Sequence, residues 1–275
     1  MEYFWNPWHG CRRYSEGCEN CYMFYLDKQR GRDGGDIYKV KTNFTLPVKR
    51  DRSGAFKIPD GSTVNVCLTS DFFLEDADPW RDEAWAMIKA RSDVFFWLLT
   101  KRAPRMEECL PADWGDGYQN VSINVTVENQ RCADERLPLL LKMPAKHKGA
   151  MVAPFIGPVD MEKHLESGQI ESVIADGENY EGARPLRYEW VESLYGQCVR
   201  NGVPFSFRGI GSIFIKNGMA YHVPKAYQHV QALRSGLQYP PSGEKTDIQP
   251  RCTSCSRKDY CSGCSWCGKC AEEKL

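Results

Sequence analysis

The sequence lacks an excess of charge of either sign, because 36 lysines and arginines balance 36 aspartates and glutamates. This balance excludes the strongly basic character of a protein that coats nucleic acid, although a local basic groove stays open. The chain also has no apolar run near the ~20 residues that span a bilayer. Its first residues lack the basic and then apolar pattern of a signal peptide. We therefore expect a soluble, cytoplasmic protein without a membrane partner.

Short apolar runs alternate with amphipathic stretches along most of the 275 residues. This alternation predicts βαβ units with a parallel sheet, in an α/β fold. The sheet closes into a partial or complete α/β barrel or stays open and doubly wound, and spacing alone does not distinguish these. Strands are expected at residues 3–5, 64–70, 94–100, 121–127, 150–156, 172–176 and 203–208, and helices at 80–91, 128–143, 161–167 and 189–200. Asn217-Gly218, between apolar residues 212–215 and 219–223, predicts a hairpin.

The 13 cysteines are unevenly placed, with three near the start, six in the tail and four isolated. Clusters spaced two residues apart in a cytosolic chain indicate metal ligands rather than a disulfide framework. The isolated residues read as small buried hydrophobes; they are Cys67, Cys109, Cys132 and Cys198.

The early cluster is a triplet, Cys11, Cys18 and Cys21, with no fourth cysteine nearby. Three thiolates leave one coordination position open, and open positions are typical of catalytic metal sites. Two interpretations follow. The triplet either holds an iron–sulfur cluster with one iron free for a ligand, or holds zinc with His9 as the fourth group.

Ordered motifs over residues 3–225 resemble a family of phage and mobile-element proteins that carries a three-cysteine motif and is grouped with radical S-adenosylmethionine (SAM) proteins. The motifs are Trp5-Asn6-Pro7, Gly10-Cys11, Gly17-Cys18, Cys21-Tyr22, Ser70-Asp71-Phe72-Phe73, Ala77-Asp78, Trp80-Arg81, Thr100-Lys101-Arg102, Glu128-Asn129-Gln130, Asp134 with Arg136, Gly177-Glu178, Arg184-Pro185 and Trp190-Val191.

The resemblance implies a [4Fe–4S] cluster on Cys11, Cys18 and Cys21, with SAM bound to the open iron. One electron, from a reductant such as a flavodoxin or ferredoxin, would cleave SAM to a 5′-deoxyadenosyl radical that takes a substrate hydrogen. Residues 1–238 would form the partial (β/α)6-type TIM barrel of this superfamily. The cysteine spacing departs from the family's usual three and two residues, because here it is six and two.

Functional side chains of α/β barrels lie at the carboxyl ends of strands, which selects the candidate pocket. The expected cofactor-binding residues are Ser70, Asp71, Thr100, Glu128, Asn129, Asp176, Gly177 and Glu178, and the expected catalytic residues are Lys101, Arg102 and Glu128. Acidic members would accept from the ammonium or ribose of SAM, and Lys101 or Arg102 would pair with its carboxylate. Asp176-Gly177-Glu178 is the nearest match to the superfamily's Gly-Gly-Glu. For any one of these residues, the alternative is a solvated loop start or a helix cap.

Residues 239–275 read as a linker followed by a small cysteine-rich metal-binding extension. Its ligands are Cys252, Cys255, Cys261, Cys264, Cys267 and Cys270. A segment with so few other apolar residues needs metal to fold. The close spacing favours an auxiliary iron–sulfur cluster, and a zinc knuckle that caps the barrel is the alternative.

Two functions follow from these features. The first is a radical SAM enzyme acting on an unidentified small molecule, nucleotide or nucleic acid, whose phosphates would meet basic residues at 39–52 or the weaker group Lys142, Lys146 and Lys148. The second is a zinc-stabilised nucleic-acid-binding module without catalysis.

Overall fold

The computed structural model describes residues 1–240, so the six tail cysteines lie outside the described part. The chain divides into two compact units. The first contains Met1–Thr126 and Glu135–Gly149, and the second contains Val127–Asp134 and the chain from residue 150 onward.

Parallel strands form the centre of the first unit, in the order β1, β4, β5, β6 and β7. Their bounds are β1 (Glu2–Trp5), β4 (Thr63–Val66), β5 (Phe95–Thr100), β6 (Val121–Thr126) and β7 (His147–Val152), and β7 continues into the second unit. In register, Tyr3 is opposite Val64, Val64 opposite Phe96, and Phe96 opposite Val121. All six residues of β6 are buried, as expected for a strand covered on both faces.

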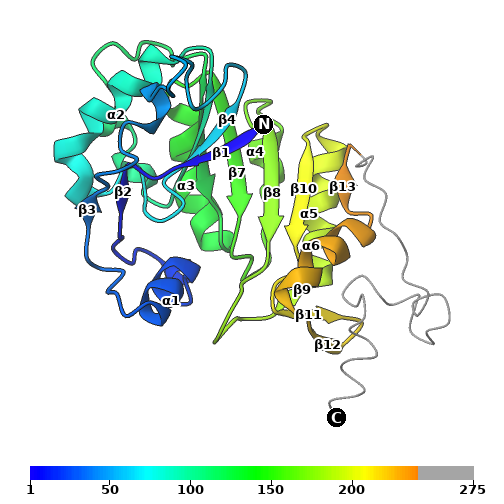
Figure 1. Cartoon of the computed structure of the whole chain (residues 1–275). Coiled ribbons are helices and arrows are strands. Elements are labelled where there is room, and N and C mark those ends of the chain that lie inside the picture. The colour runs from blue at the N-terminus through cyan, green and yellow to red at the C-terminus, as the bar shows by residue number, and fades with distance from the viewer. Residues whose placement is uncertain (241–275) are drawn as a thin grey trace. The chain divides into compact units, whose positions relative to one another are not determined.

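Helices and short elements connect these strands (Figure 1). The helices are α1 (Tyr22–Gln29), α2 (Asp78–Ala90) and α3 (Gln130–Lys142), of which α3 is shared between the units. A two-stranded antiparallel pair joins β2 (Trp8–His9) to β3 (Tyr38–Lys39). Single turns of 3-10 helix are η1 (Glu16–Cys18), η2 (Leu46–Val48), η3 (Glu75–Ala77), η4 (Ala103–Arg105) and η5 (Glu107–Cys109).

The second unit has the strand order β7, β8, β10 and β13, in which β8 (Ser172–Asp176) and β10 (Phe205–Gly209) are parallel neighbours. Its other elements are α4 (Glu162–Leu165), α5 (Tyr188–Arg200), α6 (Lys225–Arg234) and the antiparallel β13 (Gln238–Tyr239). A separate sheet has the order β12, β11, β9, with bounds β9 (Leu186–Arg187), β11 (Ile213–Lys216) and β12 (Met219–His222).

The expected α/β class is confirmed, because both units contain parallel strands joined through helices. The hairpin is also confirmed, with Asn217 and Gly218 both at positive φ. The strand expected at 64–70 is too long. It ends at Val66 because Cys67 has a φ of +60°, which turns the chain out of the sheet. The four isolated cysteines are buried as expected.

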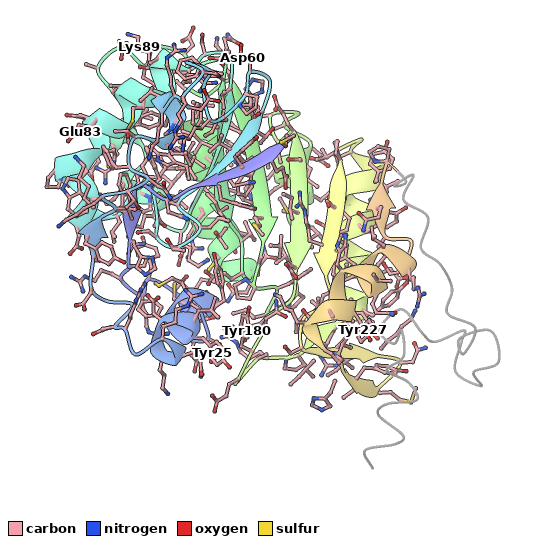
Figure 2. All side chains as sticks on the ribbon, viewed as in Figure 1. Tyr25, Asp60, Glu83, Lys89, Tyr180 and Tyr227 are labelled. Carbon is pink, nitrogen blue, oxygen red and sulfur yellow. The ribbon has the colours of Figure 1, made fainter. Side chains whose placement is uncertain are left out.

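One cation, Arg91 at the end of α2, is wholly buried and ties several segments of the first unit together. Its guanidinium donates to the carbonyls of Pro47 and Ile58 and pairs with Asp93 at 2.7 Å. It also lies 3.9 Å from the centre of the Phe56 ring. Figure 2 labels Asp60, a more distant partner at 3.5 Å. Arg91 therefore holds the loop before β4 against α2.

Replacing Arg91 with Ala should lower the free energy of unfolding by about 3 kcal/mol, because it leaves buried carbonyls without a donor. Arg50 is the matched control, since its guanidinium lies 3.8 Å from the centre of the same Phe56 ring but its hydrogen bond is exposed. Arg50→Ala should cost less than about 1 kcal/mol. Urea unfolding of both variants measures the difference, and equal losses would contradict the role given to Arg91.

The same pair predicts a pH dependence. The hydrogen bonds from Arg91 hold the pKa of Asp93 at about 2, below its ordinary range. A lowered pKa stabilises the folded state above the unfolded-state pKa of about 4, and this contribution is lost as pH falls towards 2. The stability difference between the wild type and Arg91→Ala should therefore shrink between about pH 4 and pH 2. A constant difference over that range would contradict the assignment.

Candidate functional site

The segment that carries Cys11 is fixed by backbone hydrogen bonds on both sides. Gly10 donates to the carbonyl of Thr69 at 3.2 Å, and Cys11 donates to the carbonyl of Gly34 at 2.9 Å. Gly10 has a φ of +88°, and a Cβ there would lie 2.2 Å from the carbonyl oxygen of Asp36. Only glycine fits at this position, so the turn that presents Cys11 depends on it.

Cys18 and Cys21 lie at the start of α1. Cys18 ends η1, and Cys21 is the N-cap residue of α1, with its carbonyl accepting from Tyr25 at 3.1 Å. Cys18 is buried, whereas Cys11 and Cys21 are partly exposed. None of the seven cysteines within residues 1–240 is in a disulfide bond. Three free thiols therefore come from one short segment.

The three thiols are close enough to interact electrostatically. Burial is the largest cause that raises the pKa of Cys11 to about 12, followed by the charge of Asp71. Arg102 acts in the opposite direction, and both Cys18 and Cys21 raise the pKa further. A bound cation reverses this balance, because metal ligation deprotonates thiols. The local electrostatics thus fit a site whose thiolates form when metal binds.

Three thiols are a donor set that fits a [4Fe–4S] cluster with one open iron. Within the described residues, no three His, Cys, Asp or Glu side chains are grouped around one ion position. A [4Fe–4S] cluster does not need such a grouping, because each thiolate binds a different iron. His9, considered as a fourth zinc ligand, instead places its Nε2 atom 2.6 Å from Asp27 Oδ2.

The carboxylate of Asp71, which follows β4, is surrounded by donors. Its Oδ1 accepts from the hydroxyl of Thr100 at 2.8 Å and from the N–H of Phe73 at 3.0 Å. Its Oδ2 accepts from the N–H of Lys101 at 3.0 Å and from Arg102 Nη1 at 3.3 Å. Asp71 is only 5% exposed, so these bonds hold the ends of β4 and β5 together.

Arg102 connects this carboxylate to the cysteine segment. Its Nη2 donates to the carbonyl of Arg12 at 2.9 Å, and its Nη1 lies 3.9 Å from the sulfur of Cys11, as donor. Its Nε donates to Glu75 at 3.2 Å. With its side chain buried and contacts at all three nitrogens, Arg102 is oriented towards the thiol.

Ser70 makes a third connection, since its hydroxyl donates to the carbonyl of Gly10 at 2.5 Å. Ser70 and Arg102 therefore bind the carbonyls of Gly10 and Arg12, the residues on either side of Cys11. The sequence-predicted residues Ser70, Asp71, Thr100 and Arg102 do lie together with Cys11. Asp71 binds Thr100 and Arg102, whereas Ser70 and Arg102 bind the cysteine segment.

In the second unit, Glu128 and Asn129 follow β6 and precede α3. Asn129 Oδ1 accepts from the N–H of Cys132 at 3.1 Å, the usual geometry of a helix N-cap. Glu128 is wholly buried, and its Oε2 accepts from the thiol of Cys132 at 3.6 Å. Asn129 thus matches the helix-cap alternative.

Asp176, Gly177 and Glu178 follow the end of β8. Burial raises the pKa of Asp176 to about 7, and its Oδ1 is buried without a hydrogen-bond partner among the described residues. A Cβ at Gly177 would lie 2.6 Å from the backbone nitrogen of Gly211, so the backbone segments at Gly177 and Gly211 approach closely here. Glu178 pairs with Arg184, whose Nη2 and Nε donate to its two carboxylate oxygens at 2.5 and 2.9 Å.

The sequence did not predict two residues of the first unit that contact Arg102, namely Glu75 and Tyr14. The carboxylate of Glu75 pairs with the positive charge of Arg102. The centre of the Tyr14 ring lies 5.1 Å from the guanidinium carbon Cζ of Arg102. Glu75 belongs to the acidic stretch before α2, where it reads as a helix-start residue. No pattern in the sequence marks Tyr14.

The basic stretch at 39–52 has internal partners. Lys39 lies 2.6 Å from Glu83, which Figure 2 labels, and 3.9 Å from the centre of the Phe44 ring. Arg50 donates to the carbonyl of Gly54. Lys148, from the weaker basic group, donates to the carbonyl of Leu141 at 3.0 Å. Within residues 1–240, no helix is both long and apolar enough to cross a membrane.

Asp71→Asn should destabilise the chain by about 3 kcal/mol, because the amide cannot accept from four donors and leaves Arg102 without its buried counter-ion. Asp76→Asn is the control, since Asp76 pairs with the exposed Arg12 in the same region. That change should cost less than about 1 kcal/mol. Urea unfolding of the metal-free proteins compares the two variants. If Asp71→Asn lowers the free energy of unfolding no more than Asp76→Asn does, the stabilising role given to the hydrogen bonds of Asp71 is wrong.

Comparison with known proteins identifies a family without assigning an activity. A family model described as "Protein of unknown function (DUF5131)" matches residues 1–256. This match includes the cysteine triplet, all described residues, and two of the tail cysteines, Cys252 and Cys255. No similar chain was found among curated proteins or among solved structures. Because the match covers most of its length, the chain belongs to the DUF5131 family.

Proposed function

We propose that this protein is a radical SAM enzyme whose [4Fe–4S] cluster is held by Cys11, Cys18 and Cys21. The observation that carries the proposal is the arrangement of the three free thiols. They lie in one segment, Cys18 and Cys21 raise the pKa of Cys11, and Arg102 and Ser70 bind the carbonyls of Arg12 and Gly10 on either side of Cys11. The parallel strands of both units favour the partial (β/α)6-type barrel of this superfamily.

The protein groups bind and orient, whereas the cofactors supply the reaction. When bound, the cluster and SAM would supply radical chemistry, in which one electron from a flavodoxin- or ferredoxin-type reductant would cleave the C5′–S bond of SAM to methionine and a 5′-deoxyadenosyl radical that takes a substrate hydrogen. Cys11, Cys18 and Cys21 would hold three irons of the cluster and would leave the fourth for SAM.

Among the candidate SAM-binding residues of the first unit, Lys101 has the most suitable chemistry, because it is a half-buried cation at the end of β5 and would pair with the SAM carboxylate. In the second unit, Asp176 has a buried Oδ1 without a partner within residues 1–240, and it stays a predicted cofactor-binding residue. Glu128, Asn129, Gly177 and Glu178 remain candidates with supporting roles, since Asn129 and Glu178 already bind protein groups.

The tail is proposed to hold an auxiliary iron–sulfur cluster that passes electrons or binds substrate, with zinc as the alternative. The substrate class stays open between a small molecule, a nucleotide and a nucleic acid. The alternative function, a zinc-stabilised nucleic-acid-binding module, rests on the tail and on a basic stretch whose Lys39 and Arg50 have internal partners.

The test uses the full chain purified and reconstituted without oxygen. We expect a brown protein with iron and acid-labile sulfide that releases 5′-deoxyadenosine from SAM under dithionite. Cys18→Ala should abolish this release and remove one cluster, while the tail iron remains. Cys109→Ala is the matched control, because Cys109 is also a free, buried cysteine but lies outside the triplet; it should keep both.

Two results would overturn the proposal. One is a colourless protein that holds stoichiometric zinc after anaerobic preparation, which would favour the binding module. The other is SAM cleavage that survives in Cys18→Ala, which would place catalysis away from the triplet.

A further inference from the structure

We infer that Arg102 is a positioning residue that raises the reduction potential of the triplet's cluster by directing an N–H group at the sulfur of Cys11. This inference rests on the proposed function and gives Arg102 a role different from the pairing with SAM expected from the sequence. It concerns residues of the first unit only.

The geometry of Arg102 leaves little freedom for another role. Its Nη1 lies 3.9 Å from Cys11 Sγ and 3.3 Å from Asp71 Oδ2, and its Nη2 donates to the Arg12 carbonyl beside the thiol. Glu75 accepts from the third nitrogen, Nε. The residue is 2% exposed. A planar, forked cation satisfies these directions together, whereas a lysine ammonium is a single point charge.

Hydrogen bonds to the sulfur atoms of an iron–sulfur cluster and its cysteine ligands change the reduction potential of the cluster. Reduction adds negative charge to a cluster and its thiolates, so a nearby donor and positive charge favour the reduced form. Arg102 also offsets Asp71, whose charge acts on Cys11 in the opposite direction. Removing Arg102 would therefore withdraw a donor and leave an uncompensated carboxylate near the thiolate. Both changes make the cluster harder to reduce.

The experiment measures the midpoint potential of the reconstituted full chain by electron paramagnetic resonance during a redox titration without SAM. The signal of the triplet's cluster is the one absent in Cys18→Ala, which separates it from any tail cluster. Arg102→Gln should lower this midpoint by the equivalent of a tenfold change in the reduction equilibrium, about 59 mV for one electron. Arg102→Lys should fall between Arg102→Gln and the wild type, because it keeps the charge without the fork.

Arg105→Gln is the matched control. Arg105 is three residues further along the same turn and shares Glu75, but its sulfur contact is to Cys109 and not to the triplet. The midpoint potential of the triplet's cluster in Arg105→Gln should equal the wild-type value. A general loss of structure would affect both variants, whereas the proposed contact affects Arg102→Gln alone.

A second pair of variants keeps the inference testable if Arg102→Gln fails to fold. Glu75 is half exposed, and removing its charge leaves more of the Arg102 charge uncompensated. Glu75→Gln should therefore raise the midpoint, while Glu108→Gln, which loses only an exposed pair with Arg105, should not. An unchanged midpoint in both Arg102→Gln and Glu75→Gln would overturn the inference. Failure of the proposed function looks different, because the wild type would then show no signal that depends on Cys18.

Discussion

The buried ion pair between Asp71 and Arg102 is the interaction on which the candidate site depends. One carboxylate accepts four hydrogen bonds from the ends of β4 and β5, and one guanidinium carries that order to the cysteine segment. Buried pairs of this kind contribute little net stability, because desolvation offsets attraction. They do fix geometry, since breaking either partner leaves an unpaired charge. Here the fixed geometry includes the position of a thiol.

The chemistry of the triplet follows from where the protein places Cys11. The pKa of the partly exposed Cys11 thiol is raised by desolvation, by the charge of Asp71 and by the two other thiols, so this thiol resists ionisation on its own. Metal binding supplies the missing positive charge, so the same environment that disfavours a free thiolate is compatible with a ligated one. The charge of Arg102 acts against this resistance by lowering the pKa of Cys11. Under the proposed function, metal ligation, the geometry of the cysteine segment and the electron affinity of the cluster would depend on one set of residues.

Much of this arrangement could be predicted from the sequence. Apolar runs located the parallel strands, and the carboxyl ends of β4 and β5 brought Asp71, Thr100 and Arg102 together as expected. Their roles were harder to predict, because a strand-end carboxylate looks the same whether it faces a ligand or its own backbone. Asp71 and Asn129 both proved to bind backbone donors. Two features could not be predicted because they arise from tertiary packing and leave no periodic pattern in the sequence. They are the pairing of the two-residue strands β2 and β3 and the contact between Tyr14 and Arg102.

The central claim is that three thiolates hold a four-iron cluster and leave one iron for SAM. Mössbauer spectroscopy of protein reconstituted with ⁵⁷Fe tests this most directly, because it resolves inequivalent irons. The account predicts that adding SAM changes the spectrum of one iron in the cluster that Cys18→Ala lacks, while its other irons stay as they were. Spectra that do not respond to SAM, or that contain no cluster dependent on Cys18, would contradict it.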